Sequence, residues 1–286
     1  MDTSKRKIKT ILSLLMMIIL VTACSSTATG TSTPTVIPAT EEPQTTEIEG
    51  TPISATQPPV TLEGDGMPVA GEGLCANAYY PVREGSTWNY KSTGGPAGEY
   101  SFTDTITSIR DDGFTLSTQY GDLTRTQEWA CKPEGLVALQ LGGAPAAALN
   151  SQNMQLNLGV KNVSGVTFPS EIGAGDQWQH SLDFEGSMIV ADQEGAATGN
   201  AQTSFAAVGN ESVTVPAGTF DALKIQVDTT LNINVTYQGF SVPVTFSGSY
   251  TYWFVQGAGW VKASGTGNVT GTAFSETTEL QWYNIP

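Results

Sequence analysis

The segment Leu223-Lys-Ile-Gln-Val-Asp-Thr-Thr-Leu-Asn-Ile-Asn-Val235 alternates between apolar and polar residues. Six of its seven odd-numbered residues are Leu, Ile or Val, and every even-numbered residue is polar. Successive side chains of a β-strand point to opposite faces, so this period of two predicts a strand with one buried and one hydrated face. Such strands are typical of antiparallel sheets.

The sequence on either side continues the pattern. After Gln238-Gly239, nearly every second residue from Phe240 to Phe254 is apolar, so the two runs predict a long hairpin. Upstream, two further runs flank Asp111-Asp112-Gly113, which is a strong turn signal. The other predicted strands are Thr87–Ser92, Tyr100–Ile106, Phe114–Tyr120, Thr124–Lys132, Leu136–Leu141, Gln177–Val190, Ala201–Val215, Trp260–Ser264 and Thr272–Tyr283.

These long strands predict an all-β or mainly β fold. We expect one large curved antiparallel sheet, or incomplete barrel, rather than the short strands of an immunoglobulin sandwich. The composition agrees, because 31 Gly, 15 Pro and only 14% charged residues favour strands and turns over long helices. Only Ala144–Leu158 has a weak helical pattern.

Residues 1–23 have the features of an export signal. Four basic residues precede the apolar run Ile11–Val21, which is shorter than the roughly 20 residues of a membrane-spanning helix. The run ends in Val21-Thr-Ala-Cys24, which resembles the lipobox of bacterial lipoproteins. That resemblance implies cleavage before Cys24 and lipid attachment to Cys24 through acyl chains such as palmitate. The alternative is an ordinary signal peptide with an incidental cysteine.

Two acyl chains are enough to hold a protein at a membrane without a transmembrane helix. We therefore expect the membrane to be a partner through the lipid anchor. The expected location is the cell envelope, on the outer face of the cytoplasmic membrane or at an outer membrane.

Residues 24–74 are expected to form the lipidated cysteine and a disordered linker. They hold no Lys or Arg and are rich in Thr, Pro and Ser, so they bury too little apolar surface to fold. Residues 75–286 are expected to form the β-rich globular domain. With Cys24 lipidated, Cys75 and Cys131 remain as a pair in an oxidising compartment, and we predict a disulfide between them.

The charge excludes one class of partner. Four of the twelve basic residues and one of the 27 acidic residues precede Cys24, so the mature chain has eight bases, 26 acids and a net charge of −18. Nucleic-acid binding requires a basic surface, so we expect no nucleic-acid partner.

No motif for catalysis, metal binding or a cofactor is recognisable, so we expect no catalytic residue, no metal ligand and no cofactor. The single histidine, His180, shares a strand face with Trp178, and we expect it to be partly buried and structural. Four strand acids could supply the paired carboxylates of a glycosidase, although spacing alone does not pair them: Asp104, Asp183, Glu185 and Glu276.

The run Tyr79-Tyr-Pro-Val-Arg-Glu-Gly-Ser-Thr-Trp-Asn-Tyr90 resembles the opening of the β-domain in a broad set of uncharacterised bacterial envelope lipoproteins. Val213–Phe220 and Trp253–Lys262 resemble two later landmarks of the same set. Some of these domains are similar in architecture to half-barrel lipoproteins that shield an acyl chain. The landmarks are turns and strand starts, so the resemblance transfers no functional residue. We expect Trp88 and the similarly placed Trp178 to anchor the core.

We therefore expect a non-enzymatic, monomeric binding or scaffolding domain that meets an unknown extracellular or envelope partner. One alternative is a half-barrel carrier of an apolar or acyl ligand. Another is a carbohydrate-active hydrolase with paired carboxylates. The sequence leaves open whether the concave face of the sheet is a filled core or a groove.

Overall fold

The structure is a computed structural model that describes residues 73–143, 145–146, 155–190 and 193–286. These residues belong to one compact unit. The predicted signal, the lipid-attachment residue Cys24 and nearly all of the predicted linker lie outside the described residues.

The described residues form a short 3-10 helix, η1 (Gly73–Cys75), followed by thirteen strands. The strands are β1 (Thr87–Gly94), β2 (Tyr100–Arg110), β3 (Gly113–Tyr120), β4 (Leu123–Lys132), β5 (Gly135–Ala138), β6 (Gln155–Gly165), β7 (Phe168–Pro169), β8 (Gln177–Val190), β9 (Gln193–Val215), β10 (Gly218–Tyr237), β11 (Phe240–Val255), β12 (Gly259–Val269) and β13 (Thr272–Asn284).

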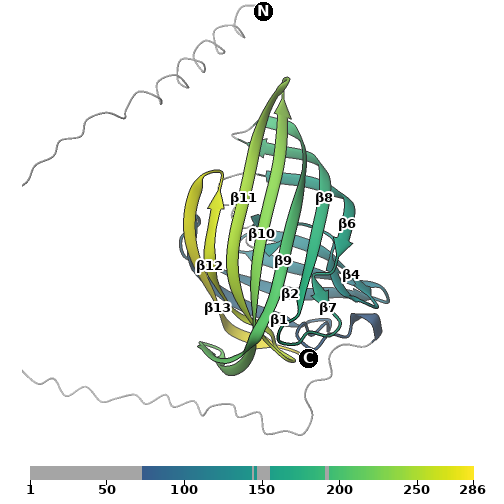
Figure 1. The fold of residues 1–286 in the computed structure, drawn as a ribbon, viewed down its shortest axis with the longest axis vertical. Helices are drawn as coiled ribbons and strands as arrows, with labels where there is room; N and C mark the ends of the chain where they lie inside the picture. Colours follow the sequence, from purple (N-terminus) through teal and green to yellow (C-terminus); the bar gives the residue numbers. More distant parts are fainter. Residues whose placement is uncertain (1–72, 144, 147–154, 191–192) are drawn as a thin grey trace, which may run out of the picture. The chain divides into compact units, whose positions relative to one another are not determined.

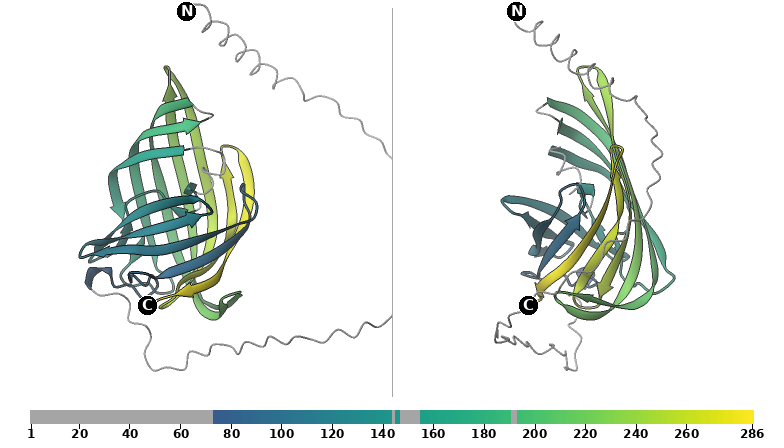
Figure 2. Two further views of the ribbon diagram at one scale, coloured as in Figure 1. Left: turned by 180° about the vertical axis from the view of Figure 1, so that it is seen from behind. Right: turned by 90° about the vertical axis from the view of Figure 1, so that its left-hand side faces the viewer.

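All thirteen strands belong to one sheet, in the order β6-β8-β9-β10-β11-β12-β13-β1-β2-β3-β4-β5-β7. Each pairing is antiparallel, and the sheet curls into a half-barrel (Figures 1 and 2). The predicted fold class, a large curved antiparallel sheet or incomplete barrel, is confirmed.

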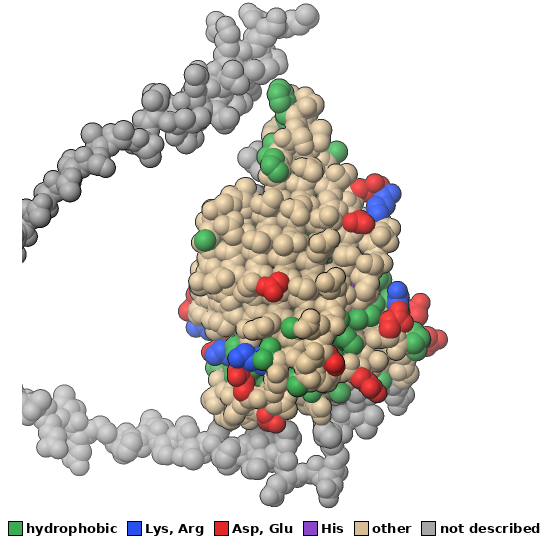
Figure 3. Space-filling view, in the orientation of Figure 1, with side chains coloured by type: hydrophobic (Ala, Val, Ile, Leu, Met, Phe, Trp, Pro, Cys, Tyr) green, Lys and Arg blue, Asp and Glu red, His purple; other side chains and the backbone are tan. Residues whose placement is uncertain are grey.

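The predicted hairpin is β10–β11, whose register runs from Leu223 opposite Phe254 to Tyr237 opposite Phe240. Odd-numbered residues such as Ile225, Leu231 and Ile233 are buried on the concave face, whereas their even-numbered neighbours are exposed. The outer face shown in Figure 3 carries few charges, and the sequence has no charged residue between Asp228 and Lys262.

The hairpin projects beyond its neighbours, and apolar side chains are exposed at its tip (Figures 1 and 3). These are Tyr237, Phe240 and Val242, and Phe240 is 77% exposed. They continue the alternation of apolar and polar residues along the hairpin. They are exposed because the neighbouring strands do not extend as far as the tip.

One end of the half-barrel is closed by the chain passing from one sheet edge to the other. Between β6 and β7, the Val166 N–H donates to the Gln179 carbonyl of β8, and the next N–H, from Thr167, donates to the Leu136 carbonyl of β5. The two edges of the sheet are therefore tied together at this point.

The segment before β1 fills the closed end. Cys75 is joined to Cys131 of β4 by a disulfide. The buried Asn77 side chain donates to the Pro169 carbonyl and accepts from the N–H groups of Tyr79 and Tyr80. The Tyr80 ring then packs among four aromatic rings that line the interior: Trp88, Phe114, Trp129 and Phe168.

Some predicted boundaries were wrong. Ala144–Leu158 was expected to be helical. Pro145 and Ala146 are helical, whereas Gln155–Leu158 begins β6; residues 144 and 147–154 lie outside the described residues. The strand predicted from Ala201 begins at Gln193, through the small residues of Gln193–Asn200. Small residues are needed there because a Cβ on Gly199 would lie only 2.8 Å from the Phe184 ring and 2.1 Å from the Asn232 carbonyl oxygen.

Candidate functional site: a cavity in the concave face

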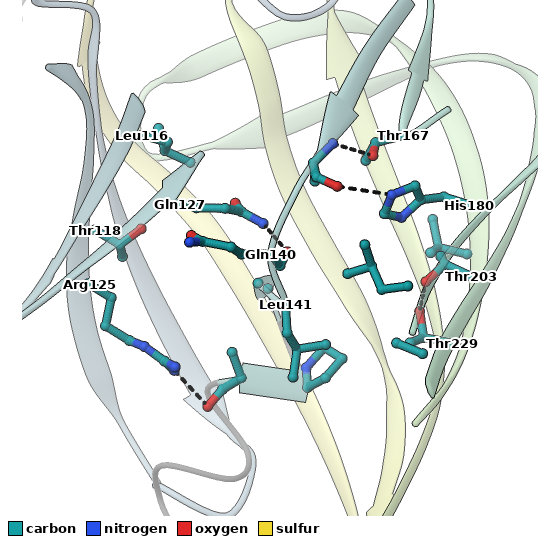
Figure 4. Close-up of a pocket in the computed structure, with 18 of the residues that line it drawn as sticks. Leu116, Thr118, Arg125, Gln127, Gln140, Leu141, Thr167, His180, Thr203 and Thr229 are labelled. Carbon is teal, nitrogen blue, oxygen red and sulfur yellow. Dashed lines mark hydrogen bonds between the residues drawn. The ribbon is translucent and has the colours of Figure 1, made fainter. Parts of the chain in front are cut away.

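The concave face encloses a cavity of about 470 Å³. Its walls come from β2–β4 on one side and from β6 and β8–β13 on the other. Gln140 and Leu141 lie between the two walls (Figure 4). Tyr80, Trp129 and Phe168 belong both to this lining and to the core at the closed end, so they form its floor. The concave face of the sheet is therefore filled by side chains at the closed end and forms a cavity above them.

Most of the lining is aromatic or aliphatic. Burial raises the pKa of the cavity tyrosines Tyr80, Tyr100, Tyr250 and Tyr252 above that of free tyrosine, so their hydroxyls stay protonated at physiological pH. They offer hydroxyl groups without charge. Cavities of roughly 300–1,000 Å³ with mainly apolar walls and a few polar groups are typical of small-molecule sites.

One polar row crosses β2, β3 and β4. Strand register places Asp104 opposite Thr118, and Thr118 opposite Arg125, and all three side chains line the cavity. The Thr118 hydroxyl donates to Asp104 Oδ1 at 2.6 Å. Burial raises the pKa of Asp104 to about 6, against a smaller opposing effect of this hydrogen bond.

A second polar cluster surrounds Glu276 on β13. Its Oε1 accepts hydrogen bonds from Ser92 Oγ at 2.6 Å and from the Tyr100 hydroxyl at 2.8 Å. Gly265 separates Tyr250 from Glu276 in the strand register, and because Gly265 has no side chain the Tyr250 ring lies over its backbone. The Tyr250 hydroxyl is buried and makes no hydrogen bond of normal geometry among the described residues, although Glu276 is close enough to raise its pKa further.

The two cavity carboxylates do not form a facing pair. Asp104 lies opposite Trp88 of β1, whereas Glu276 lies opposite Gly94 of the same strand. Six residues along a strand span about 20 Å, well beyond the roughly 5–10 Å between the paired carboxyls of glycosidases. The other two predicted acids, Asp183 and Glu185, are exposed on β8. The geometry of the described residues therefore gives no support to the hydrolase alternative.

His180 lies at the seam between β8 and β5. It is 7% exposed, and its Nε2 donates to the Ala138 carbonyl at 3.0 Å (Figure 4). Burial lowers the pKa of His180, with a smaller opposing effect of this hydrogen bond. With Nε2 held by a backbone carbonyl, the ring acts as a structural link between strands.

Trp88 and Trp178, the two predicted core anchors, differ in how deeply they are buried. Trp88 is 4% exposed and its Nε1 donates to the Ala258 carbonyl. Trp178 is only partly buried; it stacks on Phe205 and donates to the Thr167 carbonyl. Trp88 is a full core anchor, while Trp178 covers the edge of the core.

Arg125, Thr118 and Tyr250 were not predicted from the sequence as site residues. The sequence did contain one indication for Arg125. Arg125, Trp129 and Cys131 are all odd-numbered residues of one predicted strand, so their side chains share its buried face. The disulfide cysteines belong to the core below the cavity and are not part of its lining.

Within the described residues, no group of three or more His, Cys, Asp or Glu side chains is placed to hold a metal ion. In the same part of the chain, no helix is long and apolar enough to cross a membrane.

Three solved structures are similar to this chain at a low level. One is named as an exported protein with a YmcC-like fold from Bacteroides fragilis, with 14% identity, a TM-score of 0.44 and coverage of 73% of this chain and 100% of that chain. A second is named as a lipoprotein from Parabacteroides distasonis, with 14% identity, a TM-score of 0.43 and coverage of 73% and 99%. The third is the hypothetical lipoprotein YmcC from Escherichia coli, with 11% identity, a TM-score of 0.31 and coverage of 70% and 85%. Similarities of this size do not establish a shared fold.

No curated protein matches the sequence. The sequence profile of the DUF3108-like family matches residues 128–278, from β4 through most of β13. Because this match spans more than half of the 286 residues, the chain belongs to the DUF3108-like family.

Proposed function

We propose that this chain is a lipid-anchored envelope protein that binds an apolar ligand in the concave cavity of its half-barrel. One observation carries the proposal: the cavity of about 470 Å³ has a floor of aromatic rings and walls that are mainly apolar. An apolar ligand that enters this space removes its own surface and that of the lining from water. The predicted lipobox at Cys24 would hold the domain where membrane-derived ligands are present.

The binding role needs no chemical step. The two carboxylates in the lining already accept hydrogen bonds from neighbouring hydroxyls, and they are too far apart to act together. We therefore propose a protein without enzymatic activity. Of the binding roles expected from the sequence, we propose the carrier of an apolar ligand.

A pair of neighbouring substitutions tests the proposal. Thr229 faces the cavity, where it shares a hydrogen bond with Thr203, whereas Thr230 is the next residue and is exposed on the outer face. Thr229→Phe should fill part of the cavity and weaken binding of the neutral dye N-phenylnaphthylamine by at least about tenfold, which corresponds to about 1.4 kcal/mol. Thr230→Phe should leave dye binding unchanged.

Dye fluorescence titration of both variants and of the unsubstituted chain gives the measurement, with thermal unfolding as the check on folding. Native mass spectrometry of the protein from its own membrane would identify any co-purified lipid. Equal dye affinity in a folded Thr229→Phe variant would show that the cavity is not the binding site.

A further inference from the structure

Arg125 is the only cation in the cavity lining among the described residues, and no carboxylate lies within salt-bridge distance of it. In the part of the chain that the structure describes, it makes one hydrogen bond, which is long, from Nη1 to the Ala146 carbonyl at 3.3 Å (Figure 4). A guanidinium carries five N–H donors, so most of its capacity is unused by these contacts.

Most of the other basic residues of the mature chain have a carboxylate partner. The mature chain has 26 acids and eight bases, and five of those bases, all lysines except Arg110, form salt bridges with carboxylates. A cation that is half-buried without an anionic partner costs free energy, so an anion at this position would be favoured.

The nearby acid does not supply that anion. Asp104 is two strands away in the same row and accepts its hydrogen bond from Thr118 instead. Its carboxyl has a raised pKa because burial is not offset by a neighbouring cation. Arg125 acts on the adjacent Tyr120, where its charge lowers a pKa that burial raises.

The wall around Arg125 changes from polar to aromatic along two paired strands. Thr118 lies opposite Arg125, then Leu116 opposite Gln127, and finally Phe114 opposite Trp129. Phe114 and Trp129 stack on each other and contact Tyr80 at the floor. Four residues of strand, about 13 Å, therefore separate the cation from the aromatic floor.

We infer that the cavity binds an acyl chain ending in a carboxylate, with the carboxylate at Arg125 and the chain directed toward Tyr80. A carboxylate matches the two-pronged donor geometry of a guanidinium, and the aromatic floor suits the apolar end of the chain. The Tyr250 hydroxyl, buried beside Glu276 on the opposite wall, adds a further donor that a polar group of the ligand could use. This inference rests on the proposed function and specifies its ligand.

The test compares two probes that differ only in the head group: tetradecanoic acid and tetradecanol. The protein is the chain from residue 24 with Cys24→Ser, so that its own lipid cannot compete. The protein with an unsubstituted cavity should bind the acid at least about tenfold more tightly than the alcohol at neutral pH. Charge-assisted hydrogen bonds to Arg125 form only with the carboxylate.

Arg125→Gln should remove this preference while the affinity for the alcohol changes by less than about twofold. The matched control is Arg110→Gln, which removes an arginine that is salt-bridged to Glu128 at 2.6 Å on the surface and should leave the preference intact. The comparison of acid with alcohol in the unsubstituted cavity needs no variant, so it stands even if Arg125→Gln does not fold.

Two results would overturn the inference alone, and a third would overturn the proposed function with it. Equal affinity for acid and alcohol in the unsubstituted cavity, or a preference that survives Arg125→Gln, would exclude a carboxylate at Arg125 while leaving the proposed function in place. Binding of neither probe would exclude the proposed function as well.

Discussion

At the scale of single residues, Trp88 shows how an aromatic side chain is placed at the start of a strand. Its indole is 4% exposed and donates to the Ala258 carbonyl across the closed end. Trp88→Ala should lower the free energy of unfolding by about 3–5 kcal/mol, because a large buried ring leaves a cavity. Urea unfolding measures this loss.

Trp282 is the control for this substitution because it is 50% exposed in β13. Trp282→Ala should change the unfolding free energy by no more than about 1 kcal/mol. Similar losses for Trp88→Ala and Trp282→Ala would contradict the assignment of Trp88 as a core anchor. Trp178→Ala should fall between them, since the Trp178 ring is only partly covered.

Asp104 predicts a specific pH dependence. Its pKa is about 6 in the folded protein and about 3.9 in an unfolded chain, so the folded state holds this proton more tightly. Stability contributed by Asp104 is therefore present below pH 4 and is lost as the pH rises to 6, by at most about 3 kcal/mol. Asp104→Asn cannot ionise and should be more stable than the unsubstituted protein at pH 8 but not at pH 3.5.

Thermal or urea unfolding of both proteins across this range measures the difference between them. Asp183→Asn, at an exposed position of β8, is the control and should show no such crossing. A constant difference between Asp104→Asn and the parent at all pH values would refute the raised pKa.

At the scale of elements, the β12–β13 hairpin turns through Thr270 and Gly271, which both have positive φ angles of 48° and 89°. Val269 pairs with Thr272, so the loop has two residues, and such loops favour Asn-Gly. A β-branched residue is strained at positive φ, whereas Asn tolerates it. Thr270→Asn should raise the melting temperature by about 2 °C, because relief of this strain contributes roughly 0.5–1 kcal/mol.

Differential scanning calorimetry can detect a change of this size. Thr272→Asn is the control, because Thr272 is exposed and begins strand β13. Asn is a poorer strand residue than Thr, so this control should be neutral or slightly destabilising. A lower melting temperature for Thr270→Asn would exclude strain at Thr270.

The Cys75–Cys131 disulfide joins the entering segment to β4, with 56 residues of sequence separation between the two cysteines. On the chain-entropy account, a loop of this length contributes about 4 kcal/mol. The Cys75→Ala, Cys131→Ala double variant should lose a comparable amount of unfolding free energy. Non-reducing peptide mapping should recover one cross-linked peptide pair, and free thiols at both positions would contradict the bond.

Some strands were predicted accurately from the sequence and others were missed. The strands that became β8 and β13 were placed almost to the residue, because their period of two is a local property of the chain. β6 was missed because a register shift between Val160 and Asn162 breaks its alternation, and β7 because it has only two residues. Both exist because partner strands supply their hydrogen bonds, which is information held elsewhere in the sequence.

At the scale of the whole molecule, the location of the protein is predicted to depend on Cys24. The mature chain should begin at Cys24 and carry acyl chains, and it should therefore fractionate with membranes. Cys24→Ala should yield an unprocessed or released form. Intact-mass analysis of the purified protein measures this, and cleavage elsewhere without an acyl mass on Cys24 would remove the basis for an envelope anchor.

The sequence by itself determined the class of fold and the face that each long strand buries, because alternation between Leu223 and Val235 depends only on neighbouring residues. It also located the two tryptophans at strand starts and left Cys75 and Cys131 as a pair. Only the tertiary structure decided that Asp104, Thr118 and Arg125 form one row, and that Asp104 and Glu276 stay apart. Those positions are set by strand register, which depends on hydrogen bonds between segments far apart in the sequence, such as β1 and β13.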